Sequence, residues 1–236
     1  MATAVSPVLE RRAVPPLENG ARLSAHEFLR RYAAMPDVKK AELINGVVYM
    51  PSPVRFTQHA EPDNLIQTWL GIYAMHTPGT RAGANATIRL GSDDVPQPDA
   101  LLRILPECGG QSTVDAAGYL RGAPELVVEI AASTASIDAR DKLNAYRRSG
   151  VLEYLLWRTE DAALDWWALE QDEYRLLPED SGGLLRSRVF PGLWLDRSAL
   201  LKADGPRLLR TLQAGLNDTG HGEFVEALHA KQSPPP

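Results

Sequence analysis

Residues 125–131, ELVVEIA, form a short and mostly apolar run that constrains the fold more than any other stretch of the chain. Such a run is typical of a strand buried in the centre of a sheet. A helical pattern follows, with a possible N-cap among the serines and threonine of 133–136 and a C′ glycine at Gly150. A second strand pattern occupies 152–157. A strand, a helix and a strand in this order allow the two strands to pair in parallel.

Helical and strand patterns are mixed over the rest of the chain. A helix is expected from Ser24 to Met35, with Glu27 placed as in a capping box. Asn45-Gly46 separates two apolar runs and is a strong signal for a two-residue hairpin turn. The other expected elements are helices at 62–74, 193–201 and 205–216, strands at 84–90 and 99–104, and a hairpin over 162–177. This mixture predicts an α/β fold with a mixed central sheet flanked by helices.

The length of 236 residues suits one well-buried domain and is short for two. We expect a flexible N-terminal arm over 1–21, a domain over 22–201 and a partly disordered C-terminal extension over 202–236. No run approaches the roughly 20 apolar residues of a membrane span, and the N-terminus lacks the apolar core of a secretory signal. The single cysteine excludes an internal disulfide. We therefore expect a cytoplasmic protein with no membrane partner.

The net charge of −5 argues against a strongly basic nucleic-acid binder. It does not argue against a nuclease, because a cluster of acids that binds metal is itself negative. The sequence contains no P-loop, no glycine-rich dinucleotide motif and no G-x-S-x-G motif. The five histidines are scattered singly and form no zinc pattern.

Two acids occupy unusual positions. Glu129 interrupts the apolar run. Burial of a carboxylate there reduces folding stability by an amount on the order of several kcal/mol unless the group is paired, protonated or bound to metal. Alternatively, the strand is half exposed and Glu129 faces water. Asp99 follows Pro98 and begins the next expected strand, although a turn aspartate after proline is common. If strands 99–104 and 125–131 are antiparallel neighbours, the two carboxylates meet, and such hard oxygen ligands suit Mg²⁺ or Mn²⁺.

Lys142 lies on a helical stripe that is otherwise apolar or aromatic. Ala135, Ala139, Lys142 and Tyr146 are spaced by four, three and four residues, which places them on one face. If this face turns toward the sheet, the lysine can reach a carboxylate. The alternative is a surface lysine that pairs with Asp138.

Glu42 and His59 are weaker candidates. Glu42 alternates with Ile44 on the first strand of the expected hairpin and can therefore point inward. A solvated glutamate beside Lys39 and Lys40 is an equally good interpretation. His59 precedes a helix, and a lone histidine is not by itself a ligand.

Taken together, the order and spacing of these segments resemble the Uma2 family of restriction-endonuclease-like proteins, within the PD-(D/E)XK nuclease superfamily. The resemblance covers roughly residues 22–200. The matching segments are Glu42 to Val48, His59, Pro98-Asp99-Ala100, Leu126 to Ile130, Ser133-Thr134-Ala135, Lys142 to Tyr146 and Gly150 to Tyr154.

The resemblance implies a restriction-endonuclease-like core and a Mg²⁺- or Mn²⁺-dependent endonuclease that acts on nucleic acid, with DNA as the expected substrate. It assigns Asp99 and Glu129 as metal ligands, Glu42 as an added acid on the first strand that completes the metal shell, and Lys142 as the catalytic lysine. The third position of the superfamily's E-x-K motif is Ala131 here, so the lysine function falls to Lys142 on the helix.

Two other functions remain open. One is a catalytically inactive nuclease-fold protein with an interaction or regulatory role, which the net acidity and Ala131 favour. The other is a metal-dependent hydrolase of small phosphate esters. A symmetric homodimer is the default expectation for a soluble oligomer.

Overall fold

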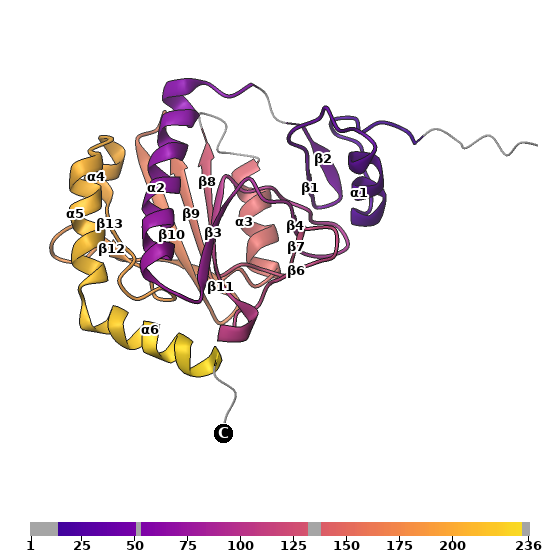
Figure 1. Ribbon diagram of the computed structural model, residues 1–236. Coiled ribbons are helices and arrows are strands. Elements are labelled where there is room, and N and C mark those ends of the chain that lie inside the picture. Colours follow the sequence, from indigo (N-terminus) through magenta and orange to yellow (C-terminus); the bar gives the residue numbers. More distant parts are fainter. Residues whose placement is uncertain (1–13, 51–52, 132–137, 233–236) are drawn as a thin grey trace, which may run out of the picture.

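A six-stranded mixed sheet forms the centre of the protein in the computed structural model, which describes residues 14–50, 53–131 and 138–232 (Figure 1). β8 and β9 pair in parallel, and the other four neighbouring pairs are antiparallel. The predicted α/β fold with a mixed sheet is therefore confirmed. In their order across the sheet, the strands are β11 (Glu173–Leu176), β10 (Ala163–Glu170), β9 (Glu153–Arg158), β8 (Leu126–Ala131), β5 (Ala100–Ile104) and β3 (Thr80–Ala84).

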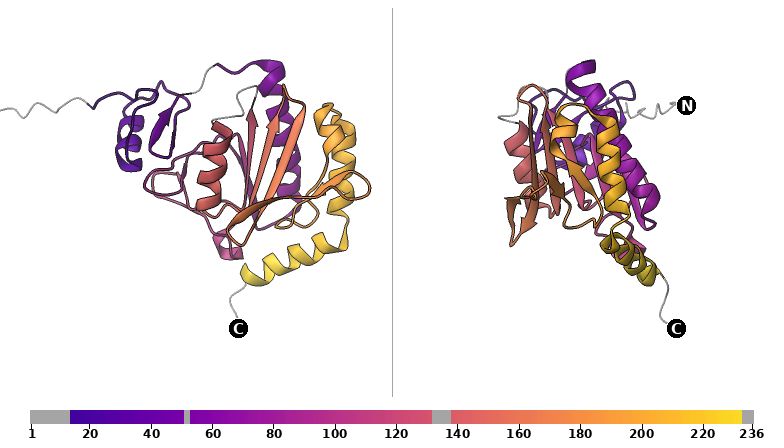
Figure 2. Two further views of the ribbon diagram at one scale, coloured as in Figure 1. Left: turned by 180° about the vertical axis from the view of Figure 1, so that it is seen from behind. Right: turned by 90° about the vertical axis from the view of Figure 1, so that its left-hand side faces the viewer.

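Helices cover both faces of this sheet (Figure 2). The helices α2 (Glu61–His76) and α5 (Gly205–Leu216) pack on one face over the larger apolar core, in which Trp69 contacts Trp166 edge to face. The helix α3 (Asp138–Arg148) packs on the other face over a smaller cluster. Because side chains alternate along a strand, β8 sends Leu126, Val128 and Ile130 toward α2. Glu129 therefore points to the side of α3.

The N-terminal part forms a small module with its own apolar cluster. It comprises α1 (Ala25–Ala33) and the hairpin of β1 (Glu42–Ile44) and β2 (Val47–Tyr49). Asn45 and Gly46 adopt φ values of 50° and 73°, as the predicted two-residue turn requires. Leu43 and Val95 exchange backbone hydrogen bonds of 3.1 and 2.7 Å, which fasten the hairpin to the segment before β5. Glu42 is thereby fixed near the start of β5.

Shorter elements complete the fold. The π-helical turn η1 (Phe56–Ala60) leads into α2. A three-stranded sheet contains β4 (Ile88–Arg89), β7 (Leu120–Arg121) and β6 (Thr113–Val114), and η2 (Pro106–Cys108) lies between β5 and β6 in the sequence. The remaining elements are β12 (Leu184–Arg186), β13 (Trp194–Asp196), α4 (Arg197–Leu201) and α6 (Thr219–Gln232).

The structure differs from three of the sequence-based expectations. The expected strand over 84–90 is wrong, because Asn85 adopts a positive φ of 50° that ends β3 and separates it from β4. The expected helix over 193–201 begins instead as β13 and becomes helical at Arg197. The helix expected over 205–216 is confirmed as α5, which contributes Leu208 and Leu212 to the core, and α6 is a further helix in the segment 202–236, where partial disorder was expected. Within the described ranges, no helix is both long and apolar enough for a bilayer span.

A buried glutamate holds β9 to the segment after β12. Glu153 is 0% exposed, and its carboxylate accepts hydrogen bonds from the backbone N–H groups of Arg188 (2.6 Å) and Val189 (3.2 Å). The hydroxyl of Ser187 and the indole N–H of Trp166 also donate to it. Burial raises the pKa of Glu153 to about 7 despite these donors.

Replacement of Glu153 by alanine should destabilise the protein by roughly 3 kcal/mol, because it leaves buried donors without an acceptor. Urea denaturation at pH 7 measures this loss. The control is Glu173→Ala on the exposed hairpin, whose effect should stay within about 0.5 kcal/mol. A loss below about 1 kcal/mol for Glu153→Ala would contradict the structural role of this carboxylate.

Candidate active site

The four side chains assigned from the sequence, Glu42, Asp99, Glu129 and Lys142, line one cavity of about 1120 Å³. The antiparallel pairing of β5 with β8 places the start of one strand beside the end of the other. As a result, the backbone N–H of Ile130 donates to Asp99 Oδ2 at 2.8 Å. The structure therefore brings the predicted residues together, while their roles in catalysis stay predictions.

Lys142 lies between two carboxylates. Its Nζ is 2.9 Å from Glu42 Oε2 and 3.0 Å from Glu129 Oε1. Its side chain is only 13% exposed, which rules out the interpretation as a solvated surface lysine. Glu129 is also buried, so the half-exposed strand is wrong as well. The hydroxyl of Tyr146, one helical turn after Lys142, donates to Glu129 Oε1 at 2.6 Å. The side chains of Asp138 and Ala139, and the whole of Ala135, lie outside the described residues.

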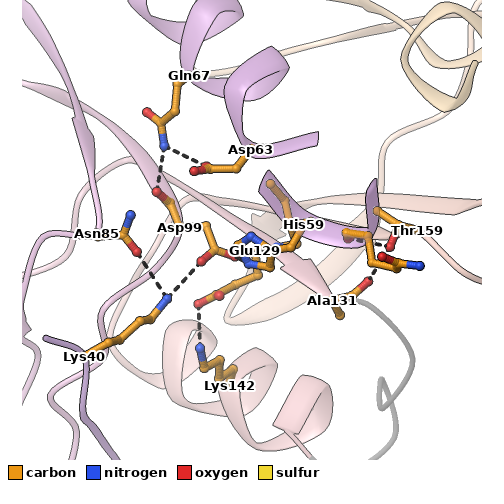
Figure 3. A network of polar contacts seen from close by, with 12 residues as sticks. Lys40, His59, Asp63, Gln67, Asn85, Asp99, Glu129, Ala131, Lys142 and Thr159 are labelled. Atoms are coloured by element: carbon orange, nitrogen blue, oxygen red, sulfur yellow. Dashed lines mark hydrogen bonds and ion pairs between the residues drawn. The ribbon is translucent and has the colours of Figure 1, made fainter. Parts of the chain in front are cut away.

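Asp99 has a different set of partners (Figure 3). Lys40 Nζ lies 2.9 Å from Asp99 Oδ1, and His59 Nε2 lies 3.3 Å from Asp99 Oδ2. The π-helical turn η1 carries His59, and such turns often occur at functional sites. The side-chain amide of Gln67 on α2 donates to the backbone oxygen of Asp99 at 2.7 Å, which fixes the residue from the other side.

The two central acids differ in their electrostatics. Burial alone would raise the pKa of Asp99, but His59 and Lys40 hold it well below its usual range. Burial raises the pKa of Glu129, and the charge of Lys142 opposes this rise without cancelling it. Burial would lower the pKa of Lys142, but the carboxylates of Glu129 and Glu42 outweigh it and raise that pKa. Lys142 therefore keeps its proton, whereas Glu129 is the acid that is protonated more readily.

The donor chemistry of the cavity fits a hard divalent cation in part. In the part of the chain that the structure describes, no group of three or more His, Cys, Asp or Glu side chains is placed to hold a metal ion. The ammonium groups of Lys40 and Lys142 occupy carboxylate oxygens instead. Glu129 Oε2 nevertheless has no partner among the described residues, and the buried hydroxyl of Tyr154, which lines the cavity, has none either. Carboxylate oxygens of this kind suit Mg²⁺ or Mn²⁺.

The sequence reasoning missed Lys40 and Tyr154 and assigned no role to His59 or Tyr146. A signal for Lys40 exists, because Lys40 and Glu42 are two residues apart and such spacing places side chains on one side of an extended chain. Tyr146 shares the helical stripe of Lys142, and its contact with Glu129 follows from that stripe. For Tyr154 no signal exists, because a tyrosine in an apolar strand is ordinary.

Replacement of Lys142 by methionine should destabilise the metal-free protein by about 3 kcal/mol at pH 8, because two buried carboxylates lose their shared cation. The folded pKa of Glu129 lies above its ordinary value of 4.5, so the carboxyl takes up a proton as pH falls. The loss should therefore be smaller at pH 5 than at pH 8. Urea denaturation in EDTA measures both, with the exposed Lys202→Met as control. Equal losses at the two pH values would contradict this pairing.

Comparisons with known proteins support the nuclease-like fold. A family model described as "Putative restriction endonuclease" (Uma2) matches residues 25–198, which is more than half of the 236 residues. A crystal structure from Anabaena variabilis, described as a "putative nuclease" of the DUF820 group, is similar with a TM-score of 0.56 and 16% sequence identity. The similarity covers 74% of this chain and 97% of that one. No curated protein matches the chain. The family match establishes that this chain belongs to the Uma2 family.

Proposed function

We propose that the protein is a divalent-metal-dependent endonuclease that hydrolyses phosphodiester bonds in nucleic acid. The observation that carries this proposal is the meeting of Asp99 and Glu129 at one cavity, with Lys142 in contact with Glu129. The family's description supports hydrolysis of nucleic acid, and the likeness to the Anabaena variabilis structure supports the fold.

Asp99 and Glu129 are the residues that would hold Mg²⁺ or Mn²⁺. Glu129 has an oxygen without a partner among the described residues, and Asp99 is kept ionised by its low pKa. A bound divalent cation would supply charge neutralisation at the phosphate and activation of water. Both carboxylates are held in place by backbone or side-chain donors, which orient them before an ion binds.

Lys142 is the residue that would stabilise the negative charge that develops on the phosphate. It remains protonated and reaches the cavity from α3. Preorganised positive charge in a site shielded from water is among the strongest catalytic contributions. Glu42 would position this lysine, because both of its oxygens have protein partners: Lys142 on Oε2 and the backbone N–H of Gln97 on Oε1. Glu42 is therefore better suited to hold Lys142 than to bind the ion.

The proposed substrate is DNA. Lys39, Lys40 and Arg55 line the same cavity as the acids and provide cations for backbone phosphates. Cleavage of both strands of a duplex needs two sites, which a symmetric homodimer would supply. Comparison of single-stranded DNA, duplex DNA, RNA and a small phosphodiester as substrates separates a nuclease from a hydrolase of small phosphate esters.

A catalytically inactive nuclease-fold protein is the second candidate. The observation that favours it is the pairing of every central acid with a lysine, since the ammonium groups already neutralise most of the negative charge. Calorimetric titration of the unchanged protein with Mn²⁺ separates the two functions. Specific binding supports the enzyme, and heats that do not exceed those of dilution support the inactive protein.

The variants Glu129→Gln and Asp99→Asn should each lower Mg²⁺-dependent DNA cleavage by roughly 100-fold or more, because each replaces a charged oxygen ligand by a neutral amide. Both should stay folded by circular dichroism. The exposed Glu173→Gln, which removes one carboxylate far from the cavity, should cleave at the rate of the unchanged protein. Full cleavage by both site variants would eliminate the proposed mechanism.

A further inference from the structure

We propose that Lys40 holds the metal-binding oxygen of Asp99 when no metal is bound, and that it moves to a phosphate of the substrate when the metal enters. This inference rests on the proposed function and adds a residue that neither the sequence motifs nor the family description assigns. It follows from how the two oxygens of Asp99 are used.

The two side-chain oxygens of Asp99 have different partners. Oδ2 accepts from the backbone N–H of Ile130 at 2.8 Å and lies 3.3 Å from His59 Nε2. Oδ1 contacts Lys40 Nζ at 2.9 Å and has no other partner among the described residues. A cation that binds Asp99 without breaking its link to β8 must therefore bind Oδ1. Lys40 already takes one of the two acceptor positions of that oxygen.

Lys40 is also the lysine that can leave. It precedes β1 on a segment outside the helices and strands, and its side chain is 24% exposed. Its second contact is a long hydrogen bond of 3.3 Å to the amide oxygen of Asn85. Lys142, in contrast, extends from a helix, is 13% exposed and contacts two carboxylates. The ammonium on Asp99 is consequently held less firmly than the ammonium on Glu129.

Charge repulsion favours the movement of Lys40. In the metal-free cavity three carboxylates contact two ammonium groups, so the opposite charges of this cluster largely cancel. Figure 3 shows two of these contacts, Lys40 with Asp99 and Lys142 with Glu129. A divalent cation at Asp99 Oδ1 would lie within a few ångströms of the Lys40 ammonium, and like charges at that distance repel strongly. A phosphate in the same cavity offers Lys40 a new partner of opposite charge. Lys40 thus competes with the metal for Asp99 and then binds a phosphate of the substrate.

The first test measures metal affinity by calorimetric titration with Mn²⁺. Lys40→Met should tighten Mn²⁺ binding by about fivefold to tenfold, because the competing cation is gone. Lys39→Met removes the same charge from the same cavity without a contact to Asp99, and its affinity should change by less than about twofold. Lys40→Arg keeps a cation at Asp99 and should not tighten binding.

The second test measures the binding of a fluorescent 20-base-pair DNA duplex in Ca²⁺, with the duplex checked by gel to be uncut. Loss of one phosphate contact lowers the slope of log affinity against log salt by about 0.9 for duplex DNA. Lys40→Met should show this loss of slope, and Lys40→Arg should retain the slope of the unchanged protein.

Unchanged or weaker Mn²⁺ binding by a folded Lys40→Met variant would overturn the inference and leave the proposed nuclease intact. An unchanged salt slope would overturn it too, because Lys40 would then have no phosphate partner. Absence of specific Mn²⁺ binding by the unchanged protein would overturn the proposed function, and the role of Lys40 with it.

Discussion

The burial of the Glu129 carboxylate in the central sheet is the constraint on which the site depends. An unpaired carboxylate in that position would lower the stability of the fold by an amount on the order of several kcal/mol. The fold must therefore supply a partner for it. The alternation of β8 turns Glu129 toward α3, where Lys142 and Tyr146 lie one helical turn apart and both contact Glu129 Oε1. Lys142 then reaches Glu42 on the N-terminal hairpin. One buried charge thereby connects the central sheet, a helix and the N-terminal module.

The same arrangement gives the two central acids unlike properties. Asp99 lies beside Lys40 and His59, which lower its pKa, whereas burial raises the pKa of Glu129. Two carboxylates in one cavity therefore do not need to share a proton in the way that an isolated pair of acids would. In the metal-free protein, ammonium groups stabilise both acids. A divalent ion would have to replace part of that stabilisation, and under the proposed function the lysines would then take part in metal binding as well as in catalysis.

Much of the site was predictable from the sequence because its signals are local. Glu129 stands out as an acid in an apolar run. Its approach to Asp99 was expected on the condition that strands 99–104 and 125–131 are antiparallel neighbours, and the pairing of β5 with β8 fulfils that condition. Lys40 and Asp99 are 59 residues apart in the sequence, and no local sequence pattern predicts a contact over that separation. The helix α5 was predicted, but its place in the core was not, and α6 was missed, because packing against distant parts of the chain is not visible in the local sequence. The end of β3 depends on the left-handed backbone of a single residue, Asn85.

The central claim is that Asp99 and Glu129 bind one divalent cation between them. Anomalous diffraction from a crystal of the unchanged protein soaked in Mn²⁺ tests it most directly, because the signal locates the ion without reference to activity. A single strong peak is expected in contact with Asp99 Oδ1 and Glu129 Oε2, with the Lys40 ammonium displaced from Asp99. Full Mn²⁺ loading with no peak at these oxygens, and with Lys40 still on Asp99, would contradict it.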